Sequence, residues 1–171
     1  HGYQGKSLST GERSMLSSYQ EAAQAIEQGD ERSLVPFWRF FDTLEKELDH
    51  GIKQVFARCR NAADNDYTIQ EQDINVLKTL YLINYINDVR PRVGNIAILM
   101  ADRIDVDMKA RKESVKESLD RLARENYIAR TGECYAFLTD VEQEVAREIR
   151  DEKIDPASVI EEVQKIIFSK I

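Results

Sequence analysis

Residues 107–138 read DMKARKESVKESLDRLARENYIARTGECYAFL and carry the strongest structural signal in the chain. Asp107 can cap a helix, and the spacing of the apolar residues predicts that this helix runs over 107–126. Two β-prone runs follow at 127–130 and 135–138, separated by a turn that contains glycine, and they predict a β-hairpin. The apolar residues that set the helical phase are Met108, Val115, Leu119 and Leu122.

Two more helices are predicted before this stretch. Thr68 and Glu71 have the spacing of a capping box, and the residues from Ile74 to Ile86 are apolar on nearly all sides, which is typical of a central, surrounded helix. The short apolar run at 95–101 suits a helix of two turns. Three helices and a tight hairpin form the order of a winged helix-turn-helix, whose third helix can enter a DNA major groove, and we predict this fold for 67–140.

The first third of the chain predicts a helical, lid-like or linker segment over 1–66. Apolar spacing indicates one helix over 11–28 and a long, aromatic-rich helix from Phe37 to Cys59, capped by Ser33 and interrupted near Gly51. The Asn- and Asp-rich stretch 61–67 predicts a loop and a domain boundary.

The last third predicts further helices over 141–171, so the fold class is mainly α. Thr139 caps one helix over 140–150, and Asp155 followed by proline begins another. The chain opens without methionine and ends on the apolar run IIFSKI, which leads us to expect a piece of a longer protein with a missing downstream region.

Composition narrows the class of protein. The 171 residues carry a formal net charge of −7, so any nucleic-acid contact must come from a local basic patch. Cys59 and Cys134 lie in no metal-binding or disulfide pattern, and no apolar run is long enough to span a bilayer. These features predict a cytoplasmic protein with two free thiols, no metal and no membrane partner.

The candidate nucleic-acid-binding residues lie on the predicted third helix and on the hairpin. Lys109, Lys112 and Lys116 follow one stripe of the helix, where DNA phosphates can lie. Glu113 and Glu117 favour the alternative, a solvated or protein-facing surface laced with ion pairs. No Asn or Gln occupies the early part of the helix, which argues against base-specific reading. The full candidate set is Lys109, Arg111, Lys112, Lys116 and Arg130.

No set of residues predicts catalysis. The opening GYQGKS lacks the glycine spacing and the preceding strand that a phosphate-binding loop requires. His50 beside Asp49 is typical of a pair on a helix surface, and Cys59 has no histidine nearby in sequence to activate it. We expect no catalytic residue in this chain.

Several segments together resemble one protein family. These are STGERSML (9–16), QEA (20–22), LVPF (34–37), VLKTLYLI (76–83), NIA (95–97) and FLTDxEQEV (137–145). Their order resembles the large P-loop ATPase of BREX phage-defence systems, the BrxC/PglY type, in the region after its nucleotide-binding core. The resemblance covers nearly the whole chain through short motifs.

The resemblance implies that this is a non-catalytic part of an AAA-like ATPase, containing a winged helix. ATP and magnesium would bind only in the missing part of that parent, although Arg13 could reach a nucleotide from a lid helix. The implied partners are other subunits of a defence complex or a second copy, with duplex DNA contacted through phosphates. The alternative is a free-standing winged-helix transcription regulator that dimerises through helices in residues 11–59, which a Walker motif upstream in the full gene product would exclude.

Overall fold

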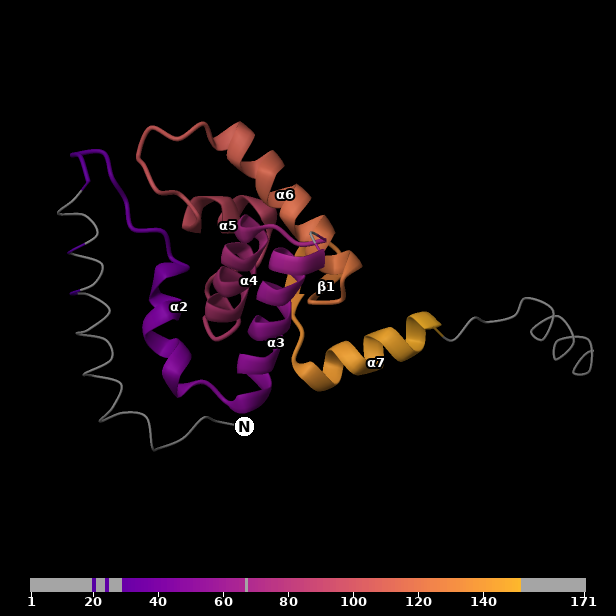
Figure 1. Ribbon diagram of the computed structural model, residues 1–171. Coiled ribbons are helices and arrows are strands. Elements are labelled where there is room, and N and C mark those ends of the chain that lie inside the picture. Colours follow the sequence, from indigo (N-terminus) through magenta and orange to yellow (C-terminus); the bar gives the residue numbers. More distant parts are fainter. Residues whose placement is uncertain (1–19, 21–23, 25–28, 67, 152–171) are drawn as a thin grey trace, which may run out of the picture.

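The computed structural model describes residues 20, 24, 29–66 and 68–151. These residues are mainly helical, and their one sheet is a two-stranded antiparallel hairpin, which confirms the predicted mainly α class with a short hairpin (Figure 1). The elements are α2 (Arg39–Leu44), a 3₁₀ turn (Glu45–Glu47), α3 (His50–Asn61), a π-helical turn (Ala62–Asp66), α4 (Glu71–Ile83), α5 (Val93–Leu99), α6 (Met108–Arg124), β1 (Ile128–Thr131), β2 (Cys134–Phe137) and α7 (Asp140–Asp151).

Helix α4 lies at the centre of the molecule, as its all-round apolar pattern predicts. It contacts α2, α3, α5, α6 and β2, and these neighbours surround it in Figure 1. Leu77 and Val76 have no exposed surface, and even the polar Thr79 is fully buried. Burial on every side, rather than helix propensity alone, therefore stabilises this element.

Helix α6 begins at its predicted cap. The Asp107 carboxylate accepts hydrogen bonds from the backbone N–H groups of Lys109 and Ala110, which satisfies two free donors of the first turn. At the other end, Asn126 adopts a φ of 61°, and the Tyr127 N–H donates to the Leu122 carbonyl oxygen at 2.9 Å. This left-handed residue with its backward hydrogen bond is a Schellman cap, and it turns the chain into the hairpin.

The hairpin is tight, and a third segment joins it. β1 and β2 pair from Ile128 opposite Phe137 to Thr131 opposite Cys134, and Gly132 in the turn has a φ of 62°. The Tyr135 N–H also donates to the Pro91 carbonyl oxygen at 2.9 Å. The stretch just before α5 thus lies against β2.

The N-terminal helices differ from the prediction of one long helix interrupted at Gly51. The chain breaks instead at Leu48 and Asp49, where ψ is 149° and 152°, while Gly51 lies inside α3. The break lets the rings of Phe41 and Phe56 meet with centroids 4.3 Å apart. On one straight helix these residues would lie about 22 Å apart, so burial of both rings requires the chain to turn back.

Three local predictions need smaller corrections. Ser33 does not cap a helix; it hydrogen-bonds to Asp30 and forms a β-bridge with Arg103. The predicted loop at 61–67 is a π-helical turn over Ala62–Asp66. The helix start predicted at Thr68 lies two residues later, because the Asp73 carboxylate accepts from the Gln70 N–H at 2.9 Å and so sets the first turn.

Helix α7 begins as predicted, with Thr139 and Glu142 exchanging hydrogen bonds around its first turn. It packs against α3 and extends away from the helical body in Figure 1. No helix of the described segments is long and apolar enough to cross a membrane. The helices predicted over 11–28 and from Asp155 lie outside the described residues.

Candidate nucleic-acid interface

The three candidate lysines of α6 lie together on its solvent-facing side. Lys109, Lys112 and Lys116 are all exposed, and none of them forms an ion pair within the described segments. Eight other cations of the described residues have an acidic partner, and six further ones form no ion pair there: Arg39, Lys46, Lys53, Arg90, Arg130 and Arg147. The paired cations are Arg32, Arg58, Arg60, Lys78, Arg92, Arg103, Arg111 and Arg121.

The lysine stripe borders the start of α5. The Cε atom of Lys112 lies 4.0 Å from the point that a Cβ on Gly94 would occupy. Just before α5, Arg92 forms a 3.4 Å ion pair with Glu133 at the tip of the hairpin. The lysines of α6, the start of α5 and the hairpin tip therefore lie on neighbouring surfaces.

Arg130 is held within the hairpin. Its Nε donates to the Gly132 carbonyl oxygen at 3.0 Å, and its guanidinium lies 5.7 Å from the centre of the Tyr135 ring. These contacts fix the direction of an exposed cation beside the turn. Because Arg130 is exposed, its remaining guanidinium N–H groups are available to donate to a phosphate.

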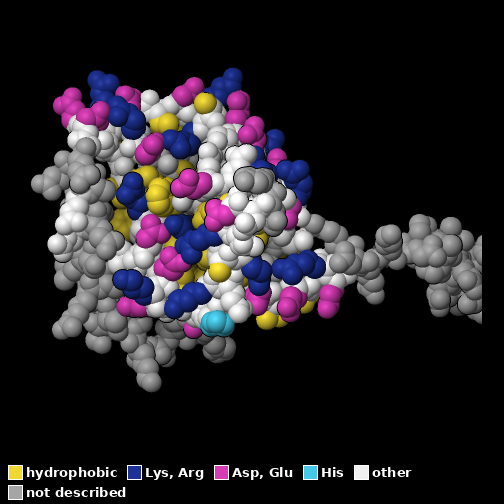
Figure 2. All heavy atoms as spheres, viewed as in Figure 1, with side chains coloured by type: hydrophobic (Ala, Val, Ile, Leu, Met, Phe, Trp, Pro, Cys, Tyr) yellow, Lys and Arg dark blue, Asp and Glu magenta, His cyan; other side chains and the backbone are white. Residues whose placement is uncertain are grey.

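Acidic side chains limit the positive charge of this surface. Glu113, Glu117 and Asp120 are exposed on the outer side of α6 and form no ion pair with the lysines. The predicted salt-bridge lacing by Glu113 and Glu117 is therefore not seen. Figure 2 shows the same mixture over the visible face, where dark blue and magenta side chains alternate.

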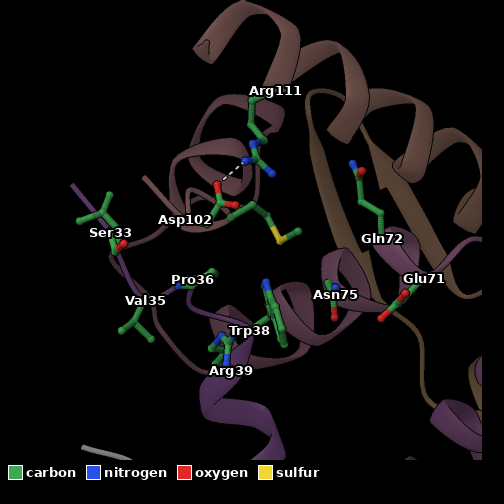
Figure 3. Close-up of a pocket in the computed structure, with 12 residues that line it drawn as sticks. Ser33, Val35, Pro36, Trp38, Arg39, Glu71, Gln72, Asn75, Asp102 and Arg111 are labelled. Atoms are coloured by element: carbon green, nitrogen blue, oxygen red, sulfur yellow. Dashed lines mark hydrogen bonds and ion pairs between the residues drawn. The ribbon is translucent and has the colours of Figure 1, made fainter. Parts of the chain in front are cut away.

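Arg111 points to a different side of α6 from the lysines. It forms a 2.5 Å ion pair with Asp102 and lines a pocket of about 470 Å³ between α2, the start of α4 and the turn before α6 (Figure 3). Of the five candidates, Arg111 thus belongs to another site. The pocket is lined by Ser33, Leu34, Val35, Pro36, Trp38, Arg39, Glu71, Gln72, Asn75, Met100, Asp102 and Arg111.

The pocket combines an aromatic wall with charged and amide groups. The Trp38 ring has the guanidinium of Arg39 5.2 Å from its centroid and the Lys78 ammonium 5.4 Å from it. Gln72 is held by a hydrogen bond to Ser114. Sequence spacing does not predict this pocket, because its walls come from segments that are distant along the chain.

Cys59 and His50 both lie on α3, in different surroundings. Cys59 is fully buried, and burial raises the pKa of its thiol to about 12, with the nearby Asp73 charge adding to the effect. His50 is exposed on α3, and its ring hydrogen-bonds to Gln54. The described segments contain no cluster of three or more His, Cys, Asp or Glu side chains that could hold a metal ion.

Arg13, the candidate nucleotide-sensing residue, lies outside the described residues. Comparisons of the chain with known proteins do not assign it to a family. No protein-family model matches the chain, and no solved structure matches it.

Proposed function

We propose that residues 67–140 form a winged-helix binding module, in which α4, α5 and α6 are the three helices and β1–β2 is the wing. The order of the elements supports this assignment. The hydrogen bond from Tyr135 to Pro91 supports it further, because it ties the segment before α5 to the hairpin. In this arrangement α6 is the helix that faces a nucleic acid.

The proposed activity is sequence-tolerant contact with the phosphates of duplex DNA. The observation that carries it is the stripe formed by Lys109, Lys112 and Lys116, which are exposed on one side of α6 and form no ion pair within the described segments. Lysine ammonium groups attract phosphates without reading bases. The neighbouring glutamates keep the attraction weak, so binding is strongest at low salt.

The test is fluorescence anisotropy with two labelled DNA duplexes of unrelated sequence. The wild-type chain binds both equally, and affinity falls as salt rises. Lys112→Glu/Lys116→Glu weakens binding at least about tenfold and lowers the salt slope by about 2, since two phosphate contacts are lost. Glu113→Lys/Glu117→Lys strengthens binding.

The matched control is Lys46→Glu/Lys53→Glu, which makes the same change in charge near the 3₁₀ turn, away from α6. This control reduces affinity much less than the α6 pair. Equal losses in both variants would show that only net charge matters and would overturn the assigned surface. Absence of binding by the wild type at low salt would overturn the DNA proposal itself.

We further propose that this module belongs to a larger AAA-like P-loop ATPase of the BREX type, as the sequence resemblance implies, and that it has no catalytic role of its own. The competing proposal is a free-standing transcription regulator. Sequencing the full gene separates the two, because a Walker motif upstream would exclude the regulator.

A further inference from the structure

Helix α7 has the reverse of the usual amphipathic arrangement. A helix on a protein surface normally buries apolar residues and exposes polar ones. On α7, the fully buried side chain is the polar Gln143, whereas Val141, Val145 and Ile149 are 68%, 49% and 69% exposed. Their four-residue spacing places all three on one side of the helix.

The side of α7 that meets the protein is held by polar contacts. The Gln143 Oε1 accepts from Arg58 at 3.0 Å, and its Nε2 donates to the Leu138 carbonyl oxygen at 3.0 Å. Asp140 forms a 2.6 Å ion pair with the same Arg58. These contacts orient the first turn of α7 against α3 and leave the apolar stripe on the opposite side.

Acidic residues flank the stripe on both sides. At 100° per residue, Glu142 lies beyond one edge of the line through Val141, Val145 and Ile149, and Glu144 and Glu148 lie beyond the other. Neither Glu144 nor Glu148 has an ion-pair partner in the part of the chain described. These two like charges are four residues apart, a spacing at which they repel each other.

We propose that this surface of α7 docks an amphipathic helix of another polypeptide, one whose apolar stripe is flanked by Lys or Arg. The apolar side chains of α7 supply the buried contact, and the glutamates select the charge of the partner. A second copy of α7 would bring glutamates against glutamates. An anionic membrane would repel them as well. The segments at 11–28 and 155–171 each contain more acidic than basic residues, so they fit the stripe less well.

The experiment uses two labelled synthetic helices as probes for the full chain. Both carry the same leucine stripe, flanked by lysine in one peptide and by glutamate in the other. We expect the lysine peptide to bind at least about tenfold more tightly, the sum of three favourable surface charge pairs. Glu144→Lys/Glu148→Lys should reverse this preference, and Glu142 stays unchanged because it caps α7.

Val145→Gln/Ile149→Gln should abolish binding of the lysine peptide, since it removes the apolar contact without adding charge. The matched control is Ile98→Gln on α5, which removes a side chain that is 61% exposed and should leave binding intact. Circular dichroism confirms that each variant keeps its helix content.

Five outcomes overturn the proposal. Equal affinity for both peptides would show that the glutamates do not select the charge of the partner. Absence of affinity for either peptide would show that the stripe is not a docking site. Self-association that Val145→Gln/Ile149→Gln abolishes assigns the stripe to a second copy, and stripe-dependent binding to anionic vesicles assigns it to a membrane. Peptide binding that occurs only after deletion of residues 152–171 assigns the stripe to that segment. None of these outcomes bears on DNA binding by α6, so this proposal and the DNA proposal fail separately.

Discussion

At the scale of single residues, burial controls the chemistry of two ionisable side chains. Cys59 on α3 has no exposed surface, and Tyr127 after α6 has almost none. Removal from water disfavours the charged forms, which raises the pKa of each group to about 12. Their ordinary values are 9.0 and 10.0, so both groups stay neutral in the folded protein well into the alkaline range.

This burial predicts a loss of stability at alkaline pH. A group whose pKa is higher in the folded state than in the unfolded state contributes stability fully below the unfolded value and loses it as the pH rises to the folded value. The free energy of unfolding should therefore fall between pH 9 and pH 12, the range set by Cys59 and Tyr127. Urea denaturation at a series of pH values measures this free energy.

Cys59→Ala isolates the thiol. The variant should be less stable near neutral pH, because the substitution leaves a small cavity. Its free energy of unfolding should begin to fall nearer the ordinary tyrosine pKa of 10.0 than the cysteine value of 9.0. Parallel pH curves for the wild type and the variant would contradict a buried, neutral thiol.

At the scale of elements, one buried ion pair joins α4 to α6. Asp73 near the start of α4 is fully buried, and both of its oxygens accept from Arg121 on α6 at 2.8 Å. The same carboxylate accepts from the Gln70 N–H at 2.9 Å. Asp73 therefore sets both the first turn of α4 and the position of the helix proposed to face DNA.

Removal of one partner should destabilise the protein strongly. Asp73→Ala leaves the Arg121 guanidinium, whose side chain is only 18% exposed, without its carboxylate, and we expect a loss of about 3 kcal/mol. Asp73→Leu/Arg121→Met should cost less than Asp73→Ala, because no charge is left unpaired. Thermal and urea unfolding give both values.

The control for this element is the more exposed pair between Glu45 and Arg60. Glu45→Ala should cost under about 1 kcal/mol, since water screens a surface pair. Comparable losses for Asp73→Ala and Glu45→Ala would show that burial does not determine the effect.

At the scale of the whole molecule, aromatic rings connect the segment before residue 67 to the helices and hairpin after it. Phe56 of α3 stacks on Phe137 of β2 with centroids 5.8 Å apart, and Phe137 meets Tyr81 of α4 at 5.2 Å. Phe41 of α2 packs on both Phe56 and Tyr81. The described residues on both sides of the predicted boundary share this core.

A shared core predicts one cooperative unfolding transition. The chain has a single tryptophan, Trp38, which lies beside α2 and reports on the N-terminal segment, while far-UV circular dichroism reports on all helices. The two signals should give the same urea midpoint. Phe137→Ala, on the far side of the predicted boundary, should lower both midpoints together and cost about 3 to 5 kcal/mol.

Separate midpoints would show that residues 1–66 and 67–140 unfold as independent domains. In that case Phe137→Ala would move the circular dichroism transition and leave the Trp38 transition in place.

The sequence by itself determined the elements whose signals lie within a few neighbouring residues. The Asp107 cap, the phase of α6, the hairpin around Gly132 and the Thr139 cap all depend on hydrogen bonds or periodicity inside one segment. Only the tertiary structure decided the turn at Leu48, which brings Phe41 onto Phe56. It also decided how α6 lies against α4, through the bond between Asp73 and Arg121.

The residues of the candidate site show the same distinction between local signals and tertiary contacts. The spacing of Lys109, Lys112 and Lys116 predicted one stripe, and a helix of any protein would place them so. The separation of Arg111 into a pocket and the polar anchoring of α7 depend on Asp102 and Arg58, which lie on other segments. Spacing along one helix determines which side chains share a face, but contacts between distant segments decide whether that face meets the core, a pocket or solvent.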